Sequence, residues 1–145
     1  MASRLRLDSL NATDALGARI ARALRRGDAV LLSGTYGAGK TALARALLRT
    51  LAGDSELDVP SPSYTLVQTY QTPIGPVHHF DLWRLDRPEA ISELGWDEAR
   101  ADTVLVEWPE RLGPFRPTDA LVVDLAHDGE DRRHATLSGW PDERL

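Results

Sequence analysis

A glycine-rich segment in the first third of the chain has the residue types and spacing that suit phosphate binding. It reads GTYGAGKT from Gly34 to Thr41 and matches the pattern G-x-x-x-x-G-K-[ST] in full. Glycines let successive backbone N–H groups approach phosphate oxygens, and a helix that starts at the loop adds the positive end of its dipole. Lys40 would bring an ammonium group to the β- and γ-phosphates, and Thr41 would offer a hydroxyl oxygen to Mg²⁺. The candidate nucleotide-binding residues of this loop are Gly37, Ala38, Gly39, Lys40, Thr41 and Ala42.

Lys40 is the only lysine in the chain. The other 16 of the 17 basic residues are arginines. The Asn-Lys-x-Asp motif with which small GTPases recognise guanine needs a second lysine, so it cannot occur here. We therefore expect ATP as the nucleotide. A compact ammonium also reaches between phosphates in a tight loop where a planar guanidinium would not substitute.

Two carboxylates stand at the ends of strand-like runs and could complete a Mg-nucleotide site, which needs such a group beside the loop. Asp81 ends the run VHHFD, and Glu107 ends VLVE. Burial of Glu107 would be costly unless a cation or hydrogen bonds met it. Asp81 could instead cap the following turn or pair with Arg84. His78 and His79 are adjacent on a strand and point to opposite faces, so they cannot bind one metal together, and packing or edge positions are expected for both.

The elements that would position these residues alternate between strands and helices. The apolar run Ala29–Ser33 has no alternation, which is typical of a central strand covered on both faces. The leucines after the glycine loop recur at helical spacing until Gly53. An earlier apolar stripe predicts a helix that Asn11 or Thr13 caps and that ends at Gly27.

The second half of the chain is richer in strands. Residues 54–63 contain two prolines and should be irregular. The runs Tyr64–Tyr70 and Val77–Leu82, with a short turn between them, predict an antiparallel hairpin. Residues 86–99 are helical in character. A buried strand is expected at 103–107, followed by a last strand pair at 120–126 and 134–138.

Composition excludes several classes of function. A length of 145 residues suits a single domain, 1–145, with one core. The net charge of −5 and the absence of a basic run argue against a stand-alone nucleic-acid binder. The chain has no cysteine, which excludes disulfides, thiolate zinc sites and cysteine nucleophiles. No signal peptide or apolar stretch of membrane-spanning length is present, so we expect a cytoplasmic protein without a membrane partner.

Four segments together resemble the TsaE family, small bacterial ATPases of the tRNA threonylcarbamoyladenosine pathway. GTYGAGKT is similar to the family's G-D-L-G-A-G-K-T, and SPSYTLV to its S-P-T-[FY]-T-L-V. HFDLWRL is similar to H-F-D-L-Y-R-L, and VEWPER to the strand end [IV]-E-W-[PA]. Their order and spacing also match from about Thr13 to Arg133. The chain departs from the family pattern at Thr35, Tyr36, Ser63 and Trp83.

The resemblance implies an α/β fold, a P-loop NTPase three-layer sandwich with a mixed central sheet, and ATP and Mg²⁺ as cofactors. It implies Thr41 and Glu107 as Mg²⁺ ligands, with Glu107 also orienting the attacking water. Asp81 would be a second catalytic carboxylate beside Lys40.

Further residues receive implied roles from the same resemblance. Ser61, Ser63 and Thr65 belong to a switch loop that responds to the γ-phosphate. Trp108 would be an aromatic beside the nucleotide or a partner surface, although plain core packing is the alternative. Thr13 would lie near the nucleotide. The loop before the last strand, at Arg132 or Arg133, would contact the base or ribose.

The implied function is a Mg-dependent ATPase, weak alone and stimulated by partners. It would serve the machinery that adds threonylcarbamoyl to the anticodon-adjacent adenosine of tRNA. Its partners would be the other proteins of the tRNA threonylcarbamoyl transferase complex, and it would meet tRNA only indirectly. Two alternatives stay open: a P-loop small-molecule kinase, and a nucleotide-gated adaptor in which hydrolysis is incidental.

Overall fold

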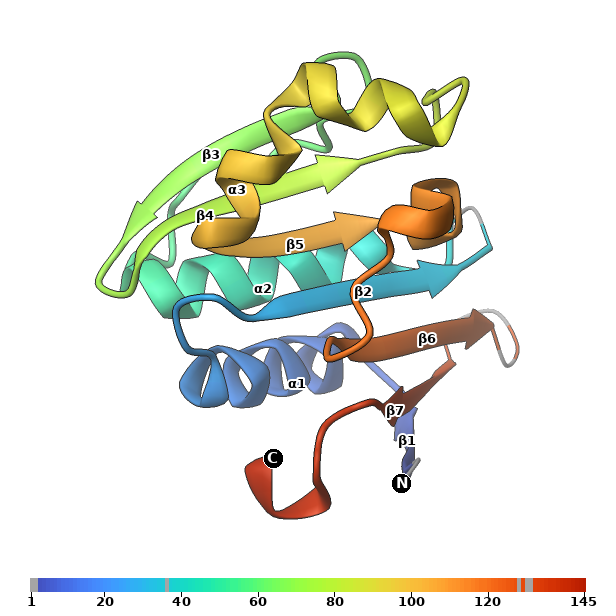
Figure 1. Cartoon of the computed structure of the whole chain (residues 1–145). Coiled ribbons are helices and arrows are strands. Elements are labelled where there is room, and N and C mark those ends of the chain that lie inside the picture. Colours follow the sequence, from blue (N-terminus) through green and yellow to red (C-terminus); the bar gives the residue numbers. More distant parts are fainter. Residues whose placement is uncertain (1–2, 36, 128, 130–131) are drawn as a thin grey trace.

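A seven-stranded sheet forms the middle of the molecule in the computed structural model, which describes residues 3–35, 37–127, 129 and 132–145 (Figure 1). The order of the strands across the sheet is β1-β7-β6-β2-β5-β4-β3. Their bounds are β1 Ser3–Leu7, β2 Ala29–Gly34, β3 Val67–Thr72, β4 Gly75–Asp81, β5 Thr103–Glu107, β6 Leu121–His127 and β7 Arg133–Ser138.

The sheet is mixed, as the resemblance implied. β2 lies in the middle and pairs in parallel with β5 and β6, and β4 pairs in parallel with β5. The remaining neighbours are antiparallel: β3 with β4, β6 with β7, and β1 with β7. The predicted hairpin and the predicted last strand pair are therefore confirmed. The carboxyl ends of β2, β4 and β5 meet at one edge of the sheet (Figure 1).

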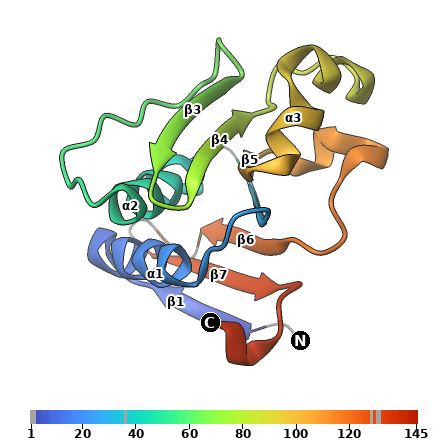
Figure 2. The same cartoon turned by 60° about the vertical axis from the view of Figure 1, so that its left-hand side comes forward.

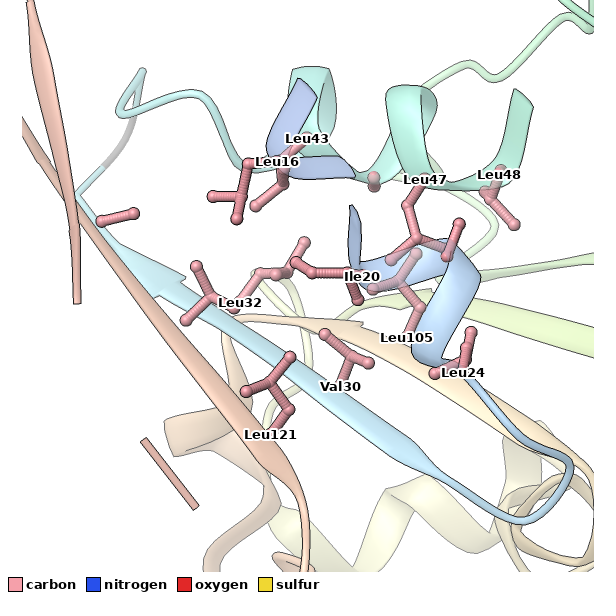
Figure 3. Close-up of a cluster of buried hydrophobic side chains, with 14 of the residues drawn as sticks. Leu16, Ile20, Leu24, Val30, Leu32, Leu43, Leu47, Leu48, Leu105 and Leu121 are labelled. Carbon is pink, nitrogen blue, oxygen red and sulfur yellow. The ribbon is translucent and has the colours of Figure 1, made fainter. Parts of the chain in front are cut away.

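Two layers of helix cover the sheet, so the three-layer sandwich is confirmed (Figure 2). The first layer holds α1 (Leu10–Ala23) and α2 (Lys40–Ala52). The second holds η1 (Pro88–Leu94), α3 (Trp96–Ala101) and η2 (Pro109–Phe115); a short turn, η3 (Asp142–Arg144), ends the chain. β2 is buried on both faces, since Val30 and Leu32 pack toward α1 and α2 (Figure 3) whereas Leu31 packs toward the second layer.

The first helix differs from its prediction at both ends. Ser9 caps α1, because its hydroxyl accepts a hydrogen bond from the Ala12 N–H at 3.2 Å. Asn11 and Thr13 lie inside the helix and not at its cap. The helix ends before Gly27, because Leu24 turns to an extended conformation and is buried. None of the helices in the described ranges is long and apolar enough to cross a membrane.

Three further differences concern local backbone. The sequence analysis did not predict β1, an edge strand whose alternation of arginine and leucine is too short to give a strong signal. The hairpin begins at Val67 and not at Tyr64, because Leu66 has a left-handed conformation with φ 68°. The helical region 86–99 is divided by Gly95, whose φ of 76° ends η1 before α3 begins.

Candidate functional site

The glycine loop connects β2 to α2, as the motif predicts. Two of its glycines are required by space as well as by backbone conformation. Gly34 has φ 136°, and a Cβ there would lie 2.3 Å from the carbonyl oxygen of Leu125. Gly39 has φ 102°, and a Cβ there would lie 3.0 Å from Nε of Arg133. Because other residues rarely adopt these conformations, glycine keeps the loop in its tight path.

Lys40 begins α2, and its ammonium group is turned back into the loop. Nζ donates hydrogen bonds to the carbonyl oxygens of Gly34 at 2.7 Å and Thr35 at 2.8 Å. It also lies 4.1 Å from the centroid of the Trp108 ring, within the range of a cation–π contact. Tyr36, one of the departures from the family pattern in this loop, lies outside the described residues.

The charge of Lys40 is held in a nearly dry environment, since the residue is only 5% exposed. Burial lowers the pKa of the ammonium group below its ordinary value. The carboxylates of Glu107, Glu110 and Asp81 act in the opposite direction and favour the charged form. The electrostatic field of these carboxylates therefore partly offsets the cost of burying the cation.

Thr41 and Glu107 lie in direct contact. Glu107 ends β5, which is the parallel neighbour of β2, so its carboxylate stands beside the loop. The Thr41 hydroxyl donates to it, with Oγ1 at 2.9 Å from Oε1 and 3.2 Å from Oε2. A hydroxyl and a carboxylate oxygen are the hard donors that Mg²⁺ prefers. Among the described residues, no group of three or more acidic, histidine or cysteine side chains could hold a metal ion.

His79 is a member of this site that the sequence analysis missed. Its ring is fully buried, and Nε2 lies 2.7 Å from Oε2 of Glu107. The burial of His79 agrees with the expected packing position, but its contact with Glu107 was not predicted. His78 does point to the other face, where it contacts Thr69 and Asp102. Strand alternation contained the missing signal, because it places His79 on the same face of β4 as Asp81.

Asp81 connects the site to the predicted switch loop. It is the partner of Glu107 in the β4–β5 register. Its Oδ2 accepts hydrogen bonds from the hydroxyls of Ser61 at 3.0 Å and Ser63 at 3.4 Å. Its Oδ1 accepts one from the backbone N–H of Trp83 at 3.1 Å, so the alternative of turn capping is also observed. The same carboxylate thus joins the strand end to residues 61–63.

Aromatic rings surround the entrance to the site. Trp108, directly after Glu107, has a left-handed backbone with φ 60° and lies with its ring 4.5 Å from that of Trp83. Tyr64 is 84% exposed, and the Arg84 guanidinium lies over its ring at 4.6 Å. Strained backbone at a non-glycine residue is typical of functional sites. Trp108 also packs against the core cluster of the second layer, so both interpretations of this residue have support and its functional role stays a prediction.

A cavity of about 340 Å³ lies between these groups. This volume falls in the usual range of small-molecule sites. The residues that line it are Gly37, Gly39, Lys40, Thr41, Ala42, Ser61, Ser63, Asp81, Trp83, Glu107 and Trp108. The structure therefore brings most of the predicted site residues around one space at the carboxyl ends of parallel strands, where ligands bind in open α/β sheets.

Four predicted residues do not line this cavity. Thr13 is buried within α1, and Ala38 is buried behind the loop. Thr65 and Arg132 are exposed. The neighbouring Arg133, the other candidate for a base or ribose contact, is the one whose side chain lies against Gly39. The nucleotide contacts assigned to Thr13, Ala38 and Arg132 and the switch role assigned to Thr65 stay predictions.

Comparison with known proteins gives consistent results. The sequence pattern of the family described as "Threonylcarbamoyl adenosine biosynthesis protein TsaE" matches residues 7–135. Curated proteins named "tRNA threonylcarbamoyladenosine biosynthesis protein TsaE" are similar over most of their length. The protein of Rickettsia bellii is 36% identical over 91% of this chain and 92% of its own. That of Rickettsia felis is 35% identical over 90% of this chain and 77% of its own.

The fold is also similar to a solved structure. The crystal structure of Bacillus subtilis YdiB superposes with a TM-score of 0.80 and 25% sequence identity. The match covers 99% of this chain and 89% of that chain. The likeness therefore extends over all three layers and includes the loop and strand ends that form the cavity.

Proposed function

The chain belongs to the TsaE family, and from this membership we propose that it serves tRNA threonylcarbamoyladenosine biosynthesis by binding and hydrolysing ATP with Mg²⁺. One observation carries the proposal: the Thr41 hydroxyl and the Glu107 carboxylate touch at 2.9 Å beside the ammonium of Lys40. A nucleotide site needs a mobile cation, a metal-binding hydroxyl and a strand-end carboxylate around one cavity. Lys40, Thr41 and Glu107 supply the cation, the hydroxyl and the carboxylate in that order.

Lys40 would bind the phosphates through its ammonium group. At present it donates to the neutral carbonyl oxygens of Gly34 and Thr35. Charged phosphate oxygens are stronger acceptors, so the side chain would turn toward them. Thr41 and Glu107 would hold the cation through their oxygens. A Mg²⁺ ion held there would supply positive charge to neutralise the phosphates.

Glu107 would also orient the attacking water, and Asp81 would act as the second carboxylate. The hydrogen bonds of Asp81 to Ser61 and Ser63 give it a route to the switch loop. If the γ-phosphate rearranges that loop, the change reaches Asp81 and then the adjacent end of β5. Hydrolysis and the state of the loop would be coupled in this way.

Partner proteins of the tRNA threonylcarbamoyl transferase complex would stimulate the reaction. No arginine is among the described residues that line the cavity, so a charge that stabilises the transition state would have to come from a partner or from a rearranged loop. Tyr64 and Trp83 are exposed beside the entrance, and aromatic residues are frequent at the energetic centres of interfaces. Contact with tRNA would be indirect.

The test measures phosphate release and tRNA threonylcarbamoylation in parallel. We expect slow hydrolysis by the isolated protein and a large increase when the partner proteins are added. Lys40→Ala should lose nucleotide binding and should fail to support modification. Vigorous turnover without partners, or full modification with Lys40→Ala, would contradict the proposal.

Two variations of this test address the alternatives. With ATP labelled at the γ-phosphate, a small-molecule kinase would label an organic acceptor, whereas an ATPase releases phosphate. Glu107→Gln should retain nucleotide and complex formation but lose hydrolysis. If the complex with Glu107→Gln still modifies tRNA through repeated cycles, the chain is a nucleotide-gated adaptor and hydrolysis is not needed.

A further inference from the structure

The His79 side chain contacts the carboxylate of Glu107, the residue that ends β5. It is 0% exposed, and its Nε2 is 2.7 Å from Oε2 of Glu107. Its position follows from the register of two parallel strands, in which His79 pairs with Leu105, two residues before Glu107. Residues two apart share a face of a strand, so both side chains point toward the layer of α1 and α2. That is the layer from which Thr41 approaches.

The hydrogen bond fixes which nitrogen of the ring carries the proton. An ionised carboxylate can only accept, so Nε2 is the donor. Nδ1 is buried and has no hydrogen-bond partner among the described residues. A proton on Nδ1 would then be a buried donor without an acceptor, which is unfavourable. The contacts therefore favour the tautomer that carries its proton on Nε2.

Glu107 accepts hydrogen bonds from two donors, one on β4 and one on α2. His79 reaches Oε2 at 2.7 Å, and the Thr41 hydroxyl lies nearest to Oε1 at 2.9 Å. A glutamate side chain has three rotatable bonds, so a single donor would leave the carboxylate free to turn. Because the hydrogen bond from His79 holds Oε2, Oε1 stays directed at the glycine loop. Removal of the histidine donor would also leave a buried charge with less compensation.

We propose that His79 is a positioning residue, which orients the Glu107 carboxylate so that Oε1 faces the cation of the nucleotide. The proposal rests on the proposed function, because it assigns Glu107 to that cation. Hydrogen bonds to metal-binding carboxylates typically change metal affinity or activity by about 10- to 100-fold when they are removed. His79 itself touches neither nucleotide nor cation in this role.

The test compares two replacements at His79 with the same two at His78. His79→Gln keeps an N–H donor near the position of Nε2, whereas His79→Leu fills similar space without a donor. His78 is the matched control, since it is adjacent in sequence but contacts Thr69 and Asp102 on the other face. The probe is Mn²⁺. Its binding to the protein in the presence of a non-hydrolysable ATP analogue is measured by electron paramagnetic resonance.

We expect His79→Leu to bind Mn²⁺ about 10- to 100-fold more weakly in the nucleotide complex. Its nucleotide affinity measured in EDTA should stay within about twofold of wild type, and kcat should fall more than KM rises. His79→Gln should recover most of the Mn²⁺ affinity, and both His78 variants should match wild type. Equal losses in the Gln and Leu variants, or Mn²⁺ affinity in His79→Leu equal to wild type, would overturn the proposal.

A measurement on the wild-type protein keeps the proposal testable if His79→Leu does not fold. In ¹⁵N-histidine NMR spectra, His79 should show a protected proton on Nε2 and an unprotonated Nδ1. A proton on Nδ1 with Nε2 bare would refute the assigned hydrogen bond. Failure of the proposed function is distinguishable, because a wild-type protein that binds Mn²⁺ with nucleotide but releases no phosphate counts against hydrolysis alone.

Discussion

The ammonium of Lys40 occupies a space that a guanidinium would not fit. Its Nζ is within 2.8 Å of two carbonyl oxygens and 4.1 Å above the Trp108 ring. The planar head of arginine is larger and carries its donors in a rigid fork. It would either displace the Trp108 ring or leave the loop. The compact head group therefore matters at this position, and not its charge alone.

Lys40→Arg is accordingly expected to lower ATP turnover by at least about tenfold although the charge is retained. The measurement is phosphate release in the presence of partner proteins, together with nucleotide affinity. Arg22→Lys on α1 is the control, since Arg22 is exposed and does not line the cavity. Near-normal turnover in Lys40→Arg would show that any cation suffices.

The residues of the site differ in how far sequence could identify them. Lys40 and Thr41 belong to a contiguous motif, and Glu107 follows an apolar strand that ends at a polar group, so local pattern was enough. His79 could not be assigned in this way. Alternation along β4 shows that its two faces differ, but not which face meets Glu107, because that depends on the β4–β5 register. Pairing across strands is a property of the fold and not of either strand alone.

At the scale of elements, the difference between local pattern and pairing across strands also explains which strands and helices were predicted well and which were not. β2 and β5 were located well, because both are buried on two faces and are continuously apolar. β1 was missed, because an edge strand gains its stability from pairing with β7 and needs little apolar content. The end of α1 was misplaced, since the burial of Leu24 and not a glycine decides where the chain leaves the helix.

The packing of α1 on α2 gives a prediction about stability. Gly17 lies where the helices approach most closely, and a Cβ there would be 2.6 Å from Cβ of Ala46 and 2.9 Å from the backbone nitrogen of Leu47. Alanine normally favours a helix over glycine by about 1 kcal/mol, but overpacking costs about 1–3 kcal/mol. We expect Gly17→Ala to lose up to about 2 kcal/mol of unfolding free energy, measured by urea denaturation.

A matched change on the exposed face of the same helix serves as the control. Ala15→Gly should lose about 1 kcal/mol through helix propensity alone, because Ala15 is exposed. If Gly17→Ala were instead more stable than wild type, the two helices would have room to separate without loss of contacts. The close approach would then not be a requirement of the fold.

The loop between α3 and β5 carries an acid-sensitive contact with β4. Asp102 Oδ2 lies 3.0 Å from Nε2 of His78, and Oδ1 lies 3.1 Å from Nη2 of Arg26. The hydrogen bond from His78 is the largest cause that lowers the pKa of Asp102 below its ordinary value of 3.8; Arg26 acts in the same direction and desolvation opposes both. A carboxyl with a depressed pKa stabilises the folded state above its unfolded pKa and loses this contribution as the pH falls through its folded pKa.

Asp102→Asn is therefore expected to be less stable than wild type at pH 7, and the difference should shrink as the pH falls below about 4. Urea denaturation at several pH values measures it. Asp119→Asn is the control, because Asp119 is 81% exposed and its nearest arginine nitrogen is 3.9 Å away. A constant difference between Asp102→Asn and wild type down to pH 3 would exclude titration of Asp102 as its cause.

At the scale of the whole molecule, the cavity depends on segments distant in sequence. The loop follows β2, Glu107 ends β5, Asp81 ends β4, and residues 61–63 come from the irregular segment between α2 and β3. Two arginines of α2 hold that segment in place, since Arg45 and Arg49 donate to the carbonyl oxygens of Val59 and Leu57. A ligand that contacts all four segments would tie them together. Nucleotide binding should therefore stabilise the complete fold.

We expect Mg-ATP at about 100 times its dissociation constant to add about 2.7 kcal/mol to the unfolding free energy, which corresponds to a rise of about 5–10 °C in Tm. Thermal denaturation measures the shift. EDTA should reduce it by removing the cation that we propose Thr41 and Glu107 hold, and AMP should give little shift because it lacks the phosphates that we propose Lys40 binds. Lys40→Ala should abolish the shift while retaining the unliganded Tm within a few degrees. An equal shift with AMP, or in Lys40→Ala, would mean that the nucleotide stabilises the molecule from a place other than this cavity.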